Sequence, residues 1–230
     1  MISRDMRGRA AGILLFASFL AFHLSSLAGG WKALDLPARL NGLLISLTIL
    51  LFVSAYFLRT KAVRRPNGAA ETWYPLFCAA LPLVIYHDGE AVRAFAPGLL
   101  SHEAVRSVFG ASSAPFLKWN VFSMALVLTG NCITLAGILY LKRSFSIMVE
   151  ARVPVFDGPY RYVRHPLYLG EALATLGVLV FRFSPLNVFL FALFLWCQTV
   201  RARFEERKLT AAFPEYGDYR KRTGAFFPKR

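Results

Sequence analysis

Residues 166–200 read PLYLGEALATLGVLVFRFSPLNVFLFALFLWCQTV, and this stretch decides the fold. It holds two apolar runs, 166–181 and 183–200, which are separated only by Arg182 and the Ser-Pro turn that follows. A helix needs about 20 apolar residues to cross a bilayer, and both runs approach that length. A proline turn ends one helix and starts the next. The stretch therefore predicts a tight hairpin of two membrane helices.

Four further apolar runs precede this hairpin, at 10–28, 40–58, 73–87 and 119–141. The run 73–87 is short and holds two prolines, so we expect about six transmembrane helices, with five possible if that segment is re-entrant. The chain is 56% hydrophobic and 17% charged, whereas soluble domains carry about 25% charged residues. The fold class that we predict is an all-α integral membrane protein, with a cytoplasmic amphipathic helix after the hairpin.

The basic residues are distributed unevenly between the two sides of the membrane. The chain has 230 residues and a formal net charge of +14. With the N-terminus inside, four segments hold 21 of the 27 Lys and Arg residues: 1–9, 59–72, 142–165 and 201–230. This bias predicts that both termini are cytoplasmic and face anionic membrane lipids. It accounts for the charge without nucleic acid as a partner, and the three cysteines lack the spacing of metal ligands.

Polar residues concentrate in 142–165 and 201–230, which are the two cytoplasmic ends of the predicted hairpin. We expect them to lie close together and to form a site at the membrane surface. In the first segment, Pro166 suits the first position of a helix. Arg164 and His165 then stand at a helix N-terminus, where a carboxylate or a phosphate would be favoured. An ordinary basic loop with interfacial tyrosines is an equally good interpretation.

The second segment contains two adjacent acids, Glu205 and Glu206, in surroundings that are otherwise basic. They could bind an ammonium, a sulfonium or ribose hydroxyls, or they could belong to a solvated helix in which Arg201 pairs with Glu205 at i,i+4. The aromatic residues at 213–227 could form a lid, an interfacial clamp or a membrane anchor. Glu171 lies inside a predicted span, which makes it a candidate for substrate binding or for structural pairing.

These motifs resemble those of a known family. The run Arg164-His165-Pro166-x-Tyr168-x-Gly170, followed by Glu205-Glu206, is similar to the signature of the isoprenylcysteine carboxyl methyltransferase family. The resemblance covers roughly residues 137–230, which we interpret as a methyltransferase core. Residues 1–136 carry membrane helices and no motif that we can match.

The resemblance implies an integral membrane enzyme that uses S-adenosylmethionine without a Rossmann domain. The sequence agrees, because it has no GxGxxG motif after a strand. The positions that match the motif would bind the cofactor; they are Tyr160, Arg164, His165, Pro166, Tyr168, Gly170, Glu205 and Glu206. The acceptor would be lipophilic and would enter from the bilayer, and a carboxylate such as an isoprenylcysteine-like group is favoured.

The nature of the acceptor decides which side chains would be catalytic. A carboxylate nucleophile needs alignment and a cationic anchor, for which Arg164 or Arg203 is a candidate. An amine or a thiol would need a proton acceptor, for which Glu206, His165 or Glu171 could serve. Related membrane methyltransferases act on phospholipid amines, so both classes of acceptor stay open.

Two other functions compete with this hypothesis. A membrane NADPH-dependent sterol-type reductase would use clustered basic residues, and four lie within 201–208, but the two glutamates at their centre argue against a phosphate site. A transport or scaffold protein is the second. Transporters of this kind often contain paired repeats with broken helices, and the sequence shows no such repeat.

Overall fold

The described residues form an all-helical bundle, as predicted. The computed structural model describes residues 4–32, 34, 36–68, 70–86, 117–181 and 183–229, and these contain no β-strand, only two isolated bridges. The helices, with two short 3-10 turns, are α1 (Arg4–Gly30), α2 (Leu36–Leu58), α3 (Ala70–Tyr86), α6 (Leu117–Leu141), η1 (Lys142–Ser144), η2 (Gly158–Arg161), α7 (Pro166–Phe181), α8 (Pro185–Ala212) and α9 (Pro214–Arg222).

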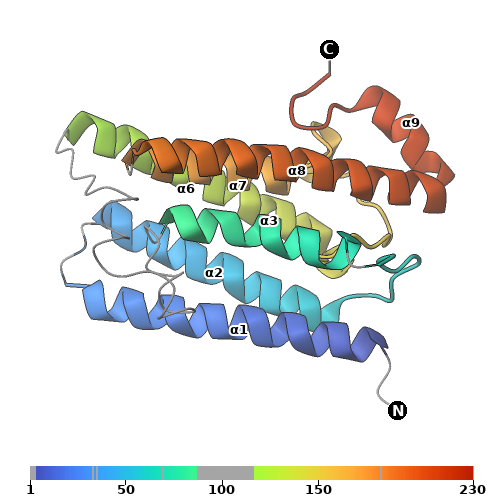
Figure 1. Cartoon of the computed structure of the whole chain (residues 1–230), viewed down its shortest axis with the longest axis horizontal. Helices are drawn as coiled ribbons and strands as arrows, with labels where there is room; N and C mark the ends of the chain where they lie inside the picture. The colour runs from blue at the N-terminus through green and yellow to red at the C-terminus, as the bar shows by residue number, and fades with distance from the viewer. Residues whose placement is uncertain are drawn as a thin grey trace.

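The long helices lie side by side and run alternately in opposite directions (Figure 1). The start of α1, the connection 59–69, the loop 142–165 and α9 all lie at one end of the bundle, on the right of Figure 1. We call this the polar end. The segments that the sequence predicts to be cytoplasmic are thus together in space, and whether they face the cytoplasm stays a prediction.

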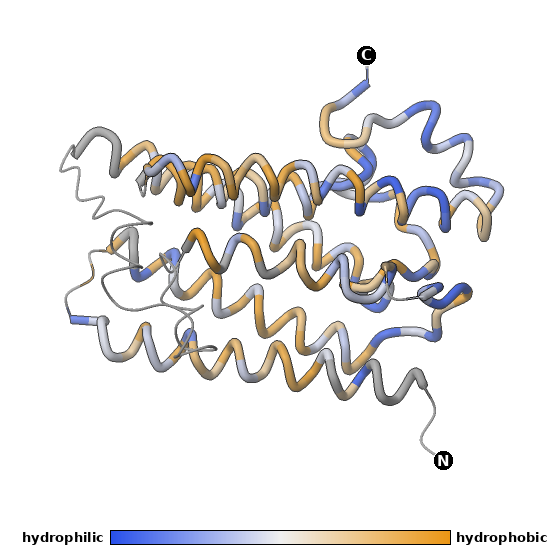
Figure 2. The backbone as a smooth tube through the Cα atoms, viewed as in Figure 1, coloured by the Kyte–Doolittle hydropathy of each residue, from blue (hydrophilic) through white to orange (hydrophobic). Residues whose placement is uncertain are grey.

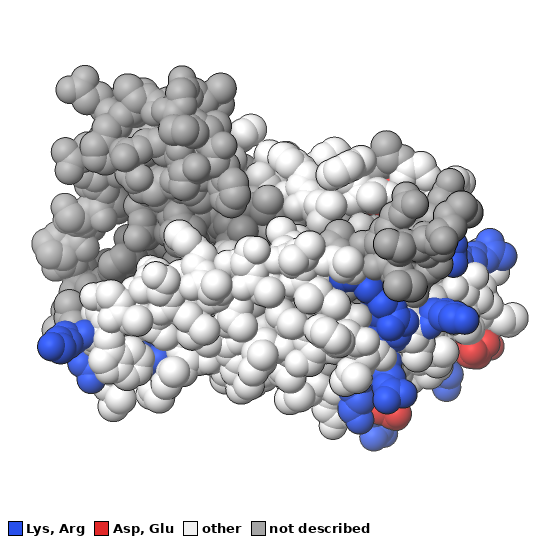
Figure 3. Space-filling model, turned by 90° about the horizontal axis from the view of Figure 1, so that it is seen from below, with Lys and Arg blue, Asp and Glu red and all other residues white. Residues whose placement is uncertain are grey.

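The surface of the bundle is that of a multi-pass membrane protein. Hydrophobic residues dominate the long helices and hydrophilic ones the polar end, where many Lys and Arg side chains gather (Figures 2 and 3). Large apolar side chains such as Leu14, Phe57, Val121 and Trp196 are exposed along the helices, as expected of side chains that contact lipid. Among the described residues, four helical segments are long and apolar enough to cross a membrane: Gly12–Gly30, Arg39–Leu58, Val121–Ser144 and Pro185–Ala212.

The other two helices of the bundle, α3 and α7, are shorter than these four, with 17 and 16 residues. The number of six spans therefore stays a prediction. The segment expected at 73–87 is helical up to Tyr86, with residue 87 outside the described residues. Its helix, α3, continues through both Pro75 and Pro82 and does not turn back within the described residues. α7 has 16 residues and starts at Pro166, the predicted first helical position.

The helices of the hairpin pack less tightly on each other than predicted. Ser184 caps α8 by accepting a hydrogen bond from the Asn187 N–H at 3.1 Å, and Pro185 follows at the first helical position. However, α7 makes its most extensive contact with α6, and α8 packs mainly on α3. α8 also extends past the apolar run to Ala212, so residues 201–209 continue the helix as expected.

Small residues explain why α7 prefers α6. A Cβ atom placed on Gly130 would lie 2.4 Å from the backbone nitrogen of Ala174, and one on Gly170 would lie 2.6 Å from the carbonyl oxygen of Gly130. Ser123 Oγ donates a hydrogen bond to the Gly177 carbonyl at 2.6 Å across the same contact. Small residues let membrane helices approach this closely. The contact fixes where α7 begins, and thereby the position of the loop before it.

Replacing Gly130 by leucine should destabilise the protein, because the new side chain meets the α7 backbone. Overpacking of this kind costs about 1–3 kcal/mol, so we expect a lower midpoint of thermal unfolding for Gly130→Leu in detergent. Gly29→Leu is the control, since a Cβ atom there meets nothing within 4 Å. Equal midpoints for the two variants would contradict the close α6–α7 contact.

Candidate functional site

The loop between α6 and α7 is fastened to two neighbouring parts of the polar end. Ala151 donates to the carbonyl of Arg64 at 3.0 Å and accepts in return at 3.3 Å, which joins the loop to the α2–α3 connection. From the other side, Arg201 of α8 donates through Nη2 to the carbonyl of Ile147 at 2.9 Å. The loop residue Phe145 stacks on Phe52 of α2, with the ring centroids 4.8 Å apart. The loop is therefore held as a fixed layer over the helices.

The chain after α9 folds back over the start of α7. The backbone N–H groups of Arg164 and His165 donate to the carbonyls of Gly224 and Ala225, at 2.8 and 3.0 Å. Tyr219 of α9 donates its hydroxyl hydrogen to the Tyr160 carbonyl at 2.6 Å. Gly158 opens this stretch with φ +59°, a conformation that favours glycine. The tail thus covers the Gly158–Tyr168 segment from outside.

A single carboxylate joins three of the segments that form the site. Glu206 of α8 accepts hydrogen bonds at Oε1 from Arg164 Nε at 2.7 Å and lies 3.0 Å from His165 Nε2. Its other oxygen lies 3.0 Å from Arg220 Nε on α9. The Arg164 and Glu206 side chains are only 9% and 7% exposed. A carboxylate this buried needs such partners, and here they come from both ends of the hairpin and from the tail.

Glu205, the neighbouring acid, belongs to a second cluster. It accepts a hydrogen bond from the Tyr168 hydroxyl and lies 3.3 Å from Arg201 Nε. The guanidinium carbon of Arg201 lies 4.6 Å from the centre of the Tyr168 ring, and the His165 ring stacks on the same tyrosine at 5.3 Å. Tyr168 is thus held between a cation and an imidazole, which fixes its orientation.

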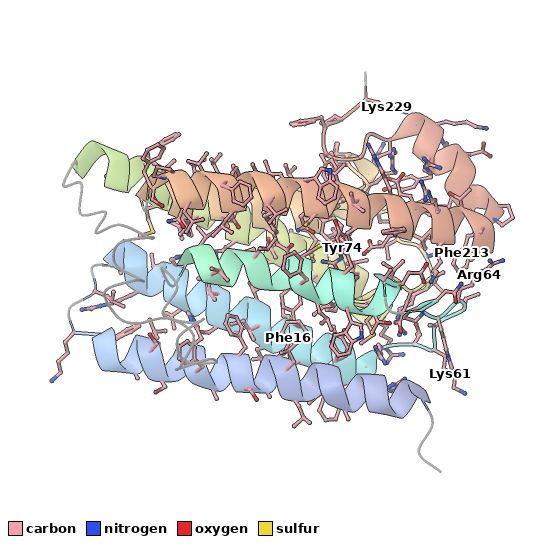
Figure 4. The ribbon with its side chains drawn as sticks, viewed as in Figure 1. Phe16, Lys61, Arg64, Tyr74, Phe213 and Lys229 are labelled. Atoms are coloured by element: carbon pink, nitrogen blue, oxygen red, sulfur yellow. The ribbon has the colours of Figure 1, made fainter. Side chains whose placement is uncertain are left out.

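A cavity lies between these two clusters and the loop. It contains about 770 Å³ of empty space, counted with the part that is open to solvent. It lies at the polar end, on the side of the bundle where Figure 4 labels Arg64 and Phe213. The polar and aromatic side chains in its wall are Ser144, Phe145, Ser146, Glu150, Arg152, Tyr160, Arg164, His165, Tyr168, Arg201, Glu205, Tyr216 and Tyr219.

Two polar atoms of this wall make no hydrogen bond within the described residues. They are Ser146 Oγ and Arg152 Nη1, and both are buried. Burial raises the pKa of the Tyr160 and Tyr216 phenols, so both stay protonated; the Tyr160 hydroxyl donates to the Gly137 carbonyl at 3.4 Å. Buried polar groups are normally satisfied. The wall therefore has hydrogen-bond donors to spare beside two carboxylates, Glu150 and Glu205, and suits a ligand that carries both charges.

The structure gathers most of the predicted cofactor-binding residues around this cavity. Five of them line it: Tyr160, Arg164, His165, Tyr168 and Glu205. Glu206 stands behind Arg164 and His165 and positions them. Pro166 starts α7, and Gly170 faces α6. Arg164 donates through Nε to Glu206 and through Nη1 to the carbonyls of Arg220 on α9 and Thr223. This guanidinium therefore already has protein partners.

Arg203, one of the two candidates for a cationic anchor, does not face this cavity. Its side chain is exposed and does not line the cavity. Residues two apart on a helix face nearly opposite sides, so Arg201, which lines the cavity, and Arg203 cannot both face it. The i,i+4 relation between Arg201 and Glu205 was the signal that could have selected Arg201. Glu171 lines a different cavity, inside the bundle.

One ion pair in the cavity wall did not follow from sequence reasoning. Arg152 contacts Glu150 Oε2 through Nε and Nη2, at 3.1 and 2.5 Å, and Arg59 lies 3.8 Å from the same oxygen. No spacing rule connects residue 59 with this loop, so only the fold brings them together. The described residues contain no group of three or more His, Cys, Asp or Glu side chains that could hold a metal ion.

The aromatic tail is divided between the cavity and the surface. Tyr216 and Tyr219 are buried and line the cavity, and Phe226 packs on the His165 ring at 5.7 Å. Phe227 is 77% exposed. The tail thus acts as a cover through its tyrosines and Phe226, and its end remains on the surface.

Residues 123–211 match the model of the isoprenylcysteine carboxyl methyltransferase family, which confirms the resemblance noted in the sequence. The protein-S-isoprenylcysteine O-methyltransferase of Schizosaccharomyces pombe is 28% identical over 120 residues, which cover 49% of this chain and 51% of that protein. Protein-S-isoprenylcysteine O-methyltransferase B of Arabidopsis thaliana is 26% identical over 114 residues, or 46% of this chain and 58% of that protein.

A cobalt-zinc-cadmium resistance protein of Cupriavidus metallidurans, CzcN, is also similar. It is 41% identical over 76 residues, which cover 33% of this chain and 35% of that protein. The matched region therefore spans about a third of the resistance protein and somewhat more than half of each methyltransferase.

Removing the charge of Glu206 should lower the stability of the protein, because the carboxylate joins three segments of the polar end. Breaking a buried ion pair by removing one partner costs about 3–5 kcal/mol, so we expect Glu206→Gln to lower the midpoint of thermal unfolding in detergent by several degrees. Glu215→Gln is the control, because Glu215 is an exposed acid on α9. If the two variants unfold at the same temperature, Glu206 does not join the three segments.

Proposed function

We propose that this chain, whose C-terminal region belongs to the isoprenylcysteine carboxyl methyltransferase family, is a membrane enzyme that transfers a methyl group from S-adenosylmethionine to a lipophilic acceptor. The observation that carries the proposal is the cavity between the Tyr160–Tyr168 segment and Glu205. It lies at the polar end of a membrane bundle and has spare donors beside two carboxylates. A water-soluble ligand would reach it from outside the bilayer.

The wall of the cavity fits the charges of this cofactor. S-adenosylmethionine, when bound, supplies an electrophilic methyl group on a sulfonium. The unpartnered Arg152 Nη1 and Ser146 Oγ suit its carboxylate, and Glu150 and Glu205 suit its ammonium or ribose hydroxyls. The tyrosine faces suit a sulfonium or an adenine ring.

Arg201 is the side chain that we assign to the acceptor. It is buried and lines the cavity, and its Nε forms an ion pair with Glu205 Oε1 at 3.3 Å. A carboxylate acceptor needs no base, but it must be held with an oxygen aligned for displacement, and a planar guanidinium does this well. We therefore place the cationic anchor at Arg201 and no longer at Arg203 or Arg164. Glu205 and the Tyr168 ring hold the guanidinium in place.

The same cavity offers apolar wall to a lipophilic acceptor. Leu141, Val153, Leu167 and Leu209 line it. The favoured acceptor is a carboxylate of the isoprenylcysteine type, in keeping with the family. Tyr216 and Tyr219 cover the cavity from the water side and would keep water from the reacting groups.

The structure makes the reductase alternative weaker. Its support was the group of basic residues within 201–208, which would bind a phosphate. In the fold these side chains separate: Arg201 is buried beside Tyr168, Arg203 is exposed, and Lys208 pairs with Glu71 on α3. They do not form one basic cluster.

Cofactor binding can be measured directly by thermal unfolding of the full chain in detergent. We expect S-adenosylhomocysteine to raise the midpoint saturably and NADPH to leave it unchanged. Arg152→Gln should weaken S-adenosylhomocysteine binding about 10-fold, since a charged hydrogen bond contributes about 1.5–3 kcal/mol. Arg161→Gln, an exposed arginine of the same loop, should bind normally. Stabilisation by NADPH alone would overturn the proposed cofactor.

Acceptor recognition can be separated from cofactor binding with a defined carboxylate, N-acetyl-S-farnesylcysteine. With labelled S-adenosylmethionine, Arg201→Gln should lower kcat/KM for this acceptor about 10- to 100-fold, because the anchoring hydrogen bonds are lost. Arg203→Gln should stay within twofold of the unchanged protein. Equal activity of the two variants, at equal affinity for S-adenosylhomocysteine, would remove Arg201 from the site.

A further inference from the structure

A second cavity lies inside the bundle, away from the polar end. It contains about 980 Å³ of empty space, counted with the part that is open to solvent, and is bounded by α1, α2, α3, α6 and α7. Most of its wall is apolar, with side chains such as Phe19, Ile49, Val127 and Val178. Six polar residues also line it: His23, Thr48, Asn131, Thr134, Glu171 and Thr175.

The hydroxyl hydrogens in this wall are already used. Thr48, Thr134 and Thr175 each donate to the carbonyl oxygen four residues earlier on their own helix, at 2.9, 3.0 and 2.7 Å. A hydroxyl has one hydrogen and two lone pairs. Toward the cavity, these threonines can therefore only accept hydrogen bonds.

Asn131 uses one of its two amide N–H donors in the same way, and His23 uses its ring N–H. Asn131 donates through Nδ2 to Asn41 Oδ1 at 2.8 Å. His23 Nε2 lies 3.1 Å from the carbonyl oxygen of Gly42, and since a carbonyl only accepts, Nε2 is the protonated nitrogen. In the neutral ring, the other nitrogen is then an acceptor. The polar part of the wall has acceptors to spare, which is the reverse of the cavity at the polar end.

Glu171 is the one acid among these lining residues, and no Lys or Arg accompanies it there. Gln198 donates through Nε2 to its Oε2 at 2.6 Å, and the residue keeps part of its surface accessible. The nearby Arg201 forms its ion pair with Glu205, within the described residues. Burying a carboxylate inside a membrane bundle costs free energy, and a hydrogen bond from a neutral amide offsets only part of that cost.

We propose that this cavity binds a compact lipophilic amine as its ammonium ion, with the ammonium hydrogens on Glu171 and the neighbouring acceptor atoms. The apolar wall would enclose the hydrocarbon part of the ligand. A carboxylate ligand is excluded, because it would place a second anion against Glu171 in surroundings of low dielectric. The site goes beyond the proposed methyl transfer, and no step of that reaction is assigned to it.

Three probes of the same shape test the charge that the cavity selects: adamantan-1-amine, adamantan-1-ol and adamantane-1-carboxylic acid. The full chain is placed in phosphatidylcholine nanodiscs, and binding is measured by thermal shift, with empty nanodiscs subtracted. The amine should bind saturably and at least 10-fold more tightly than the alcohol, and the acid should not bind. Equal binding of amine and alcohol, or binding of the acid, would overturn the proposal.

Variants locate the binding. Glu171→Gln should weaken amine binding at least 10-fold, and Asp218→Asn, at an exposed acid of α9, should leave it within twofold. Val178→Phe fills the cavity while it keeps Glu171, so it should abolish amine binding even if Glu171→Gln fails to fold. Amine binding that survives Val178→Phe would overturn the site. Because the amine is measured without S-adenosylmethionine, the result is independent of whether the chain proves to be a methyltransferase.

Discussion

The ion pairs of Glu206 are the constraint on which the polar end depends. One carboxylate on α8 binds Arg164 and His165 at the start of α7 and Arg220 on α9. A buried carboxylate would be very unfavourable without these cations, so the three segments cannot separate without exposing or stranding a charge. The cavity exists because this contact holds its two walls together. Its position at the polar end follows from the extension of α8 past the apolar run to Ala212.

The close α6–α7 contact supplies the second fixed point. Gly130 and Gly170 bring the two helix backbones together, so the loop that joins these helices must return over its own starting point. Hydrogen bonds from Arg64 and Arg201 then hold that loop down. These glycines thus determine where Tyr160 and Tyr168 lie, although neither glycine lines the cavity at the polar end.

The sequence predicted the elements and the meeting of the two polar segments because both follow from local rules. Apolar length predicts helices, and a short proline turn brings the ends of neighbouring helices together, so the approach of Arg164 to Glu206 could be expected. The sequence could not predict which helices pack together: α7 contacts α6 more extensively than it contacts α8, the helix that follows it in the sequence. Nor could the sequence show that Arg201, and not Arg203, lines the cavity, because the rotation of α8 about its axis depends on tertiary contacts. The Arg59–Glu150–Arg152 cluster joins distant segments, and no spacing indicates it.

The two cavities differ in what their walls lack. At the polar end, Ser146 and Arg152 have hydrogens without acceptors, whereas inside the bundle the threonine hydroxyls donate to carbonyls of their own helices. α7 contributes to both, with Tyr168 on one and Glu171 on the other, less than one helical turn apart. A ligand that satisfies one wall would leave the other unsatisfied. The surplus of donors in one wall and of acceptors in the other therefore favours different classes of ligand, which burial of apolar surface alone would not distinguish. Both walls include residues of the single short helix α7.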